Sequence, residues 1–180
     1  MKVFYDTEFI DVDGKTIDLV SIGMVAEDGR ELYAVSSEFD QRKLLQNTWL
    51  REHVWPSLPT TPPRQYRDGL PPHGVLDTDH PDVWTRAQIA RAVERFILDT
   101  PDVELWAYYA AYDHVALCQL WGPMMHLPEG IPMYTADLRQ EMHRLGDPDF
   151  PAQTEGLHNA LADARHNMVI DKALAALRGE

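Results

Sequence analysis

The chain has 180 residues, of which 44% are hydrophobic and 25% charged, so we expect one soluble globular domain with a substantial core. Its formal net charge of -13 argues against an overall basic nucleic-acid-binding surface, although carboxylates that hold cations reverse the charge locally. A single cysteine, Cys118, excludes an intrachain disulfide and favours a reducing compartment. Without a signal-peptide pattern or a transmembrane stretch, the expected location is cytoplasmic, with no membrane association.

The chain begins with three expected strands before any helix. Lys2–Phe9 opens with β-branched and aromatic residues, and Asp18–Ala26 alternates apolar with small or polar residues. Asp28 and Gly29 form a tight-turn signal, because this dipeptide suits the positive φ angles of a hairpin. A third strand follows at Glu31–Ser36. The pattern predicts a three-stranded antiparallel meander.

A helix is predicted for Gln41–His53, and a proline-rich segment follows at about 55–82. Seven of the thirteen prolines fall there, so we expect no regular structure in it. We interpret it as an insertion within one domain, because a strand beyond it is needed to complete the first core. The region also carries a local excess of cations, which could follow a phosphate backbone or belong to a dimer interface: Arg42, Lys43, Arg51, Arg64 and Arg67.

The second half of the chain alternates between helices and strands. The expected helices are Thr85–Leu98, Tyr112–Trp121, Thr135–Leu145 and Asn159–Leu177, and the expected strands are Val103–Tyr109 and Ile131–Tyr134. Three strands followed by alternating elements predict an α/β fold with a mixed sheet flanked by helices.

Three polar motifs accompany these elements. In Asp6-Thr7-Glu8, the two carboxylates lie two residues apart at the end of a strand, so they project to the same face. Such a pair repels itself unless a cation lies between them. Alone the motif is weak: Asp102 and Glu104 share the spacing, and a solvated strand end would also explain Asp6 and Glu8.

The other two motifs lie at the beginnings of helices. Asp113 follows a buried strand and lies at the beginning of a helix. An acidic side chain at a helix N-terminus is also favoured simply by the helix dipole. Asp163 falls in the first turn of the last helix among small alanines, and His158 lies just before that helix. Histidine is well suited to proton transfer near neutral pH, although a lone histidine is more often a surface residue.

Taken in order, Asp6-Thr7-Glu8-Phe9, then Asp113, then His158-Asn159-Ala160-Leu161-Ala162-Asp163 resemble the DEDDh exonuclease superfamily, which includes oligoribonuclease and RNase T. The resemblance spans nearly the whole chain. It implies an RNase H-like fold, in which a three-stranded antiparallel meander is joined by parallel strands, and a single exonuclease domain over residues 1–180. One position departs from the family pattern: Tyr109 stands where the second motif usually has Asn, four residues before its Asp.

The resemblance also implies the chemistry. Asp6, Glu8, Asp113 and Asp163 would bind two Mg²⁺ (or Mn²⁺) ions per site, and His158 would be the catalytic base. Thr7, Phe9 and Tyr112 would contact the substrate, although core packing explains Phe9 equally well. The substrate would be RNA with a free 3' end, single-stranded or overhanging, cleaved to nucleoside 5'-monophosphates. Relatives are often homodimers, so a homodimer is expected by resemblance.

Three other functions share these residue types. A DNA-directed proofreading or repair exonuclease would use the same motifs, because only contacts to the 2'-hydroxyl separate the sugars. A non-catalytic nucleic-acid-binding module would have no need to keep all four carboxylates and the histidine. A phosphoesterase acting on free nucleotides would also use an acidic cluster. It would not degrade a polymer stepwise from one end.

Overall fold

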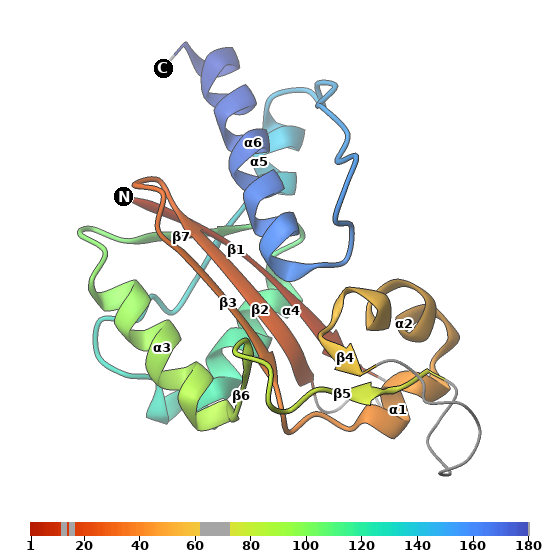
Figure 1. Cartoon of the computed structure of the whole chain (residues 1–180). Helices are drawn as coiled ribbons and strands as arrows, with labels where there is room; N and C mark the ends of the chain where they lie inside the picture. Colours follow the sequence, from red (N-terminus) through yellow and green to blue (C-terminus); the bar gives the residue numbers. More distant parts are fainter. Residues whose placement is uncertain (12–13, 15–16, 62–72, 180) are drawn as a thin grey trace, which may run out of the picture.

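The computed structural model describes residues 1–11, 14, 17–61 and 73–179. A six-stranded sheet in the order β6-β3-β2-β1-β7-β8 forms its centre (Figure 1). The predicted antiparallel meander is confirmed, and its strands are β1 (Lys2–Ile10), β2 (Asp18–Ala26) and β3 (Glu31–Ser36). The flanking pairs are parallel and involve β6 (Val83–Trp84), β7 (Glu104–Ala107) and β8 (Ala136–Asp137). This mixed sheet confirms the α/β class and is consistent with an RNase H-like fold.

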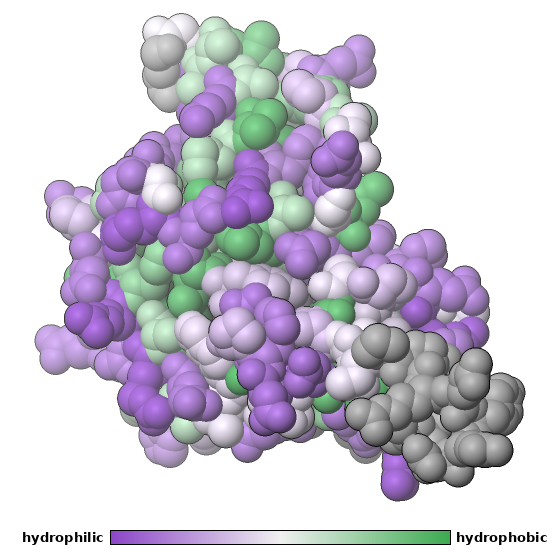
Figure 2. Space-filling model, in the orientation of Figure 1, coloured by the Kyte–Doolittle hydropathy of each residue, from purple (hydrophilic) through white to green (hydrophobic). Residues whose placement is uncertain are grey.

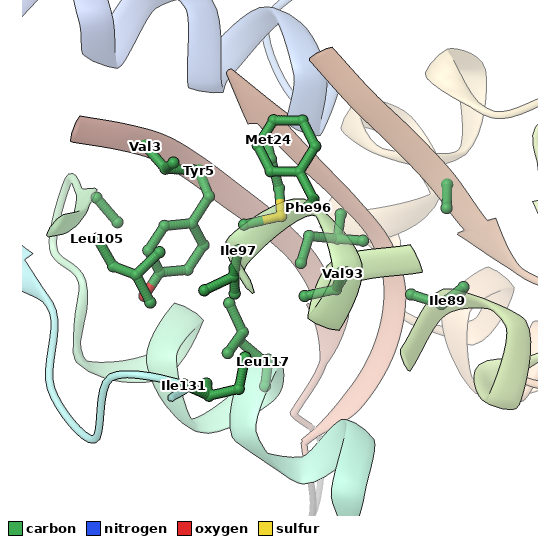
Figure 3. Close-up of a cluster of buried hydrophobic side chains, with 14 of the residues drawn as sticks. Val3, Tyr5, Met24, Ile89, Val93, Phe96, Ile97, Leu105, Leu117 and Ile131 are labelled. Atoms are coloured by element: carbon green, nitrogen blue, oxygen red, sulfur yellow. The ribbon is translucent and has the colours of Figure 1, made fainter. Parts of the chain in front are cut away.

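One face of the sheet is covered by α3 (Arg86–Leu98) and α4 (Ala111–Cys118). The predicted start of α3 is confirmed, because Thr85 and Gln88 form a reciprocal capping box. Figure 3 shows the core on this face, where α3 presents one apolar side to the sheet. Its labelled members include Val3, Tyr5, Met24, Ile89, Val93, Phe96, Ile97 and Leu117. Burying each large apolar side chain contributes about 1.5–3 kcal/mol, which holds α3 and α4 on this face.

The other face is crossed by α6 (Ala160–Arg178), which packs on β1 and β2 and next to α5 (Leu138–Arg144) (Figure 1). Phe4 of β1 is buried there with Leu138, Ile170 and Leu174. Figure 2 shows hydrophobic surface gathered between α6 and α3 on the face in view, with hydrophilic residues around it. This packing fixes α6 over the central strands, and the third motif lies at the N-terminal end of this helix.

The segment after β3 differs from the prediction. The single helix expected at Gln41–His53 is wrong: α1 (Gln41–Gln46) and α2 (Thr48–His53) are separate. Asn47 separates them, because its backbone is extended and its side chain accepts a 3.1 Å hydrogen bond from the Leu50 N–H, which caps α2.

The proline-rich segment is partly regular. The expectation of no regular structure is wrong for η1 (Trp55–Ser57) and for the hairpin of β4 (Thr60–Thr61) and β5 (Val75–Leu76). Residues 62–72 of this segment lie outside the described residues. Buried side chains of the segment, including Trp55, Leu58 and Leu76, belong to a second core cluster with Ile10 and Val35 of the sheet.

Two elements after α4 were also placed wrongly. The strand expected at Ile131–Tyr134 is not formed, and β8 lies further along at Ala136–Asp137. The next helix begins at Leu138 instead of Thr135, because the Asp137 side chain accepts from the N–H groups of Arg139 and Gln140.

Two further elements differ from the prediction. The expected helix to Trp121 ends at Cys118 and continues as two 3-10 turns, η2 (Gln119–Trp121) and η3 (Met124–His126). The β6 strand was not predicted at all. Among the described residues, no helix has the combination of length and apolar character that crossing a membrane requires.

Candidate active site

A cleft of about 880 Å³ lies where β1, α2, α4 and the N-terminal turn of α6 meet. Its lining includes all five residues that the motifs predict for catalysis: Asp6, Glu8, Asp113, His158 and Asp163. These residues come from three segments that are more than a hundred residues apart at the extremes. The fold therefore brings the three motifs to one place, although the role of each residue remains a prediction.

The first motif is carried by an irregular part of β1. The pairing of β1 with β2 shifts register between Glu8 and Phe9. Such a bulge re-aims side chains, and bulges are common beside active sites. Glu8 and Phe9 both line the cleft, although neighbours in a regular strand point to opposite faces.

Thr7 connects the first motif to the second. Its backbone N–H and its hydroxyl both donate to Asp113 Oδ1, at 2.8 and 2.6 Å, and both residues are buried. Two donors on one oxygen fix the orientation of the Asp113 carboxylate. Thr7 was predicted to bind substrate. The structure shows its hydroxyl engaged with Asp113, and contact with substrate remains a prediction.

The third motif depends on a close approach between α6 and β2. Gly23 is the register partner of Asp6, and a Cβ at Gly23 would lie 2.3 Å from the backbone of Ala160. Only glycine allows the first turn of α6 to rest on the strand at this point. Asn159 caps the helix by accepting from the Ala162 N–H at 3.1 Å. This contact sets Asp163 over the carboxylates of β1.

His158 lies beside both acidic groups. Its Nδ1 is 3.9 Å from Glu8 Oε1, and ligand atoms of Glu8, His158 and Asp163 all lie within 4.8 Å of one another. The backbone of His158 has a φ of 63°, in the left-handed region. For a residue with a Cβ this conformation costs about 1–2 kcal/mol, so neighbouring contacts must hold it.

Comparison with known proteins identifies the family. No family model matches the chain. Two curated relatives, from two strains of Mycobacterium tuberculosis, are each named 3'-5' exoribonuclease. Each is 48% identical to this chain over 171 residues, covering 93% of this chain and 89% of the relative. The chain belongs to this 3'-5' exoribonuclease family.

The carboxylates of this exoribonuclease-family site sit in an environment that opposes their charge. Burial, and then repulsion from Asp163 and Asp113, raise the pKa of Glu8 to about 8. Burial raises the pKa of Asp113 to about 6, although the hydrogen bonds from Thr7 work in the opposite direction. The pKa of Asp6 is raised by burial and by Asp113, Glu8 and Asp163, and that of Asp163 is raised by burial.

This donor set fits divalent cations. Clustered carboxylate oxygens are the ligands that Mg²⁺ and Mn²⁺ prefer, and a cation would relieve the repulsion that raises the pKa values. The group of Glu8, His158 and Asp163 also has the spacing of a metal site. His158 could thus serve as a ligand or as a base.

The two aromatic residues predicted to bind substrate pack against each other. The rings of Phe9 and Tyr112 are stacked, with centroids 6.0 Å apart and planes 17° apart. Phe9 lines the main cleft, whereas Tyr112 lines a smaller adjoining pocket of about 300 Å³. Tyr112 therefore supports Phe9 from behind in this geometry. Direct contact of either ring with a base remains a prediction.

Gln153 was missed by the sequence analysis. Its Nε2 donates to Asp163 Oδ1 at 2.6 Å and to the Glu155 carbonyl at 3.1 Å. It belongs to the loop before α6, and no motif or periodicity distinguishes a glutamine there. Trp49 of α2 was also missed, although it lines the cleft and is 49% exposed.

Among the described residues, no arginine or lysine of the basic segment lines the cleft. Arg64 and Arg67 lie outside the described residues. Arg51 donates to the Leu45 carbonyl at 3.1 Å and pairs with Glu52, so it stabilises the junction of α1 and α2. A role of this segment in following phosphates remains a prediction.

Proposed function

We propose that this protein is a metal-dependent 3'-5' exoribonuclease of the DEDDh type. It would hydrolyse the terminal phosphodiester bond at a free RNA 3' end and release nucleoside 5'-monophosphates. One observation carries the proposal: four carboxylates and a histidine from three separate motifs line one cleft, in a chain that is 48% identical to proteins named 3'-5' exoribonuclease.

Asp6, Glu8, Asp113 and Asp163 would hold two Mg²⁺ or Mn²⁺ ions. When bound, these ions supply Lewis-acid stabilisation of the attacking and leaving oxygens. Buried carboxylates with raised pKa values suit this role, because they gain most from a cation. Thr7 would keep Asp113 oriented through its two hydrogen bonds, and Gln153 would do the same for Asp163.

The remaining steps use side chains at the rim of the cleft. His158, beside Glu8 and Asp163, would accept the proton of the attacking water, since histidine is the side chain suited to this transfer near neutral pH. Phe9 would stack on the terminal base, which contributes about 1–3 kcal/mol and tolerates any base. A site built this way would recognise the 3' end and the sugar-phosphate backbone of the RNA, with little selectivity for its base sequence.

A product assay on matched variants tests the function. Single-stranded RNA and DNA labelled at the 5' end would be incubated with Mg²⁺ or with EDTA. We expect a ladder that shortens from the 3' end, requires Mg²⁺ and is faster on RNA. Asp6→Asn should abolish it. Asp102→Asn is the matched control, because Asp102 belongs to the other Asp-x-Glu pair and is exposed at a distance from the cleft.

Two of the alternatives have their own outcomes in that assay. Faster loss of DNA would favour the proofreading or repair function. Binding without cleavage of either polymer would favour the non-catalytic module.

We also propose a homodimer, to be tested by light scattering, and a cytoplasmic location, which fits the one free cysteine.

A further inference from the structure

His158 is held by a segment that none of the three motifs includes. The Ser57 Oγ lies 2.7 Å from the His158 carbonyl oxygen, across 101 residues of sequence. The same hydroxyl lies 2.8 Å from the Val54 carbonyl of its own turn, so its single proton is shared between the two oxygens. The carbonyl of His158, whose backbone is strained, is thus hydrogen-bonded to Ser57 of η1.

The His158 ring is restricted from the same direction. The indole of Trp49 meets it edge-on, with ring centroids 4.8 Å apart and an interplanar angle of 76°. Trp49 also packs on His53, at 5.1 Å, and His53 lies 5.5 Å from His158. Two elements, α2 and η1, therefore contact the ring and the backbone of one residue.

The anchor itself is firmly packed. Val54, Trp55 and Leu58 surround Ser57 in sequence and are buried in the second core cluster, together with Ile10 and Val35 of the sheet. Ser57 is therefore fixed relative to β1, on which Glu8 lies. A hydrogen bond from such an anchor can hold the His158 backbone in its left-handed conformation and fix the distance between His158 and Glu8.

We propose that Ser57 is a positioning residue for His158, and that the α2–η1 segment serves to hold the base of the active site. This inference rests on the proposed function, in which His158 accepts a proton. Ser57 would act through the His158 backbone alone. Among the described residues, the cleft lining includes Trp49 but not Ser57, so Ser57 should not touch the substrate.

The test is Ser57→Ala, compared with the wild-type protein on single-stranded RNA with Mg²⁺. Loss of the hydrogen bond lets His158 move, and a misplacement of about 1 Å can cost up to about 100-fold in rate. We expect kcat to fall about 10-fold while KM stays within about twofold. Ser57→Thr, which keeps the hydroxyl, should restore most of kcat.

A double variant separates positioning from general damage. If Ser57 acts through His158, adding Ser57→Ala to His158→Ala should change kcat by less than about twofold. Thr61→Val is the matched control, because it deletes a hydroxyl that donates to the Val75 carbonyl in the same segment, away from His158. Its kcat should equal that of the wild type.

The outcomes distinguish this inference from the proposed function. Wild-type protein that does not cleave RNA would overturn the function itself. Active wild-type protein with an unchanged kcat in Ser57→Ala would overturn the positioning role alone. A full effect of Ser57→Ala in the His158→Ala background would also overturn it, because the serine would then act on the fold in general.

Discussion

His158 and Tyr109 both have a side chain and both adopt the left-handed backbone conformation, with φ of 63° and 55°. The first is tied down by Ser57 and Trp49 and lies among the carboxylates. The second is 62% exposed and is followed by Ala110, whose N–H donates to Asp137 at 3.1 Å. Backbone strain at a residue that contacts the site suggests a functional role. Backbone strain at an exposed residue suggests that a residue type that tolerates the left-handed conformation would stabilise the protein.

His158→Ala should lower kcat by about 100- to 10,000-fold, the usual contribution of a positioned base. Binding of RNA should change by less than about twofold, because the cleft carboxylates and Phe9 remain. Rapid-quench kinetics and fluorescence anisotropy measure the two quantities. His166→Ala is the control, since His166 lines the same cleft outside the Glu8, His158 and Asp163 group. An equal loss of binding and turnover would make His158 a structural residue.

Tyr109→Asn should stabilise the protein by about 0.5–1 kcal/mol, because Asn tolerates the left-handed conformation and Tyr109 buries little surface. Urea unfolding measures the change. Tyr112→Asn offers a control of similar exposure in the helical backbone of α4, and it should not stabilise the fold. A less stable Tyr109→Asn would show that the contacts of its side chain with Tyr108 and Arg139 outweigh the strain.

At the scale of elements, periodicity identified those parts of the chain whose structure is set locally. The alternation in Asp18–Ala26 and the Thr85 cap of α3 each specify an element by themselves. The two-residue strands β6 and β8 have no such signal, because they exist only through pairing with β3 and β7. The break at Asn47 is set by a cap that the apolar spacing of Gln41–His53 conceals.

The same distinction applies to the site. The three motifs could be recognised in the sequence because the spacing of their residues along a strand or a helix is local. That the motifs meet at one site was predicted from the resemblance to a family. Gln153, Trp49 and Ser57 reach the site through tertiary packing, and nothing in their sequence neighbourhood distinguishes them. Contacts of this kind become visible only when the segments are placed in space.

The contact of α6 with β2 carries a prediction of its own. Gly23→Ala would place a Cβ against the backbone of Ala160, so the first turn of α6 must shift away from β1. We expect a loss of about 1–3 kcal/mol in stability, as for overpacked cores, and a loss of activity at temperatures where the protein remains folded. Thermal unfolding and RNA cleavage, measured on the same samples, check both.

Gly29→Asn is the control for that change. Gly29 has open space around it and a positive φ that Asn accepts, and its turn is distant from the cleft. The unfolding temperature and the RNA-cleavage activity of Gly29→Asn should both stay near those of the wild type. A Gly23→Ala protein with wild-type activity would show that α6 can shift without displacing His158 and Asp163.

At the scale of the whole molecule, the carboxylates of the cleft oppose the stability of the metal-free fold in a protein that already carries a net charge of -13. The pKa of Glu8 is raised from an ordinary value of 4.5 to about 8. Between these two values the folded protein keeps a proton that the unfolded chain has released. Raising the pH therefore disfavours the folded state, by at most about 1.4 kcal/mol per pH unit for each such proton.

In EDTA, the unfolding temperature should therefore fall as the pH is raised from about 5 to about 8, and Glu8→Gln should flatten this decline. Glu129→Gln, at an exposed site, should leave the decline unchanged. Mg²⁺ binds the folded, ionised cleft, so the stabilisation that it gives should grow with pH over the same range. Differential scanning calorimetry across pH, with and without Mg²⁺, measures both trends. A metal-free stability that rises with pH, or an Mg²⁺ effect equal at all pH values, would mean that these carboxylates are not the cation site.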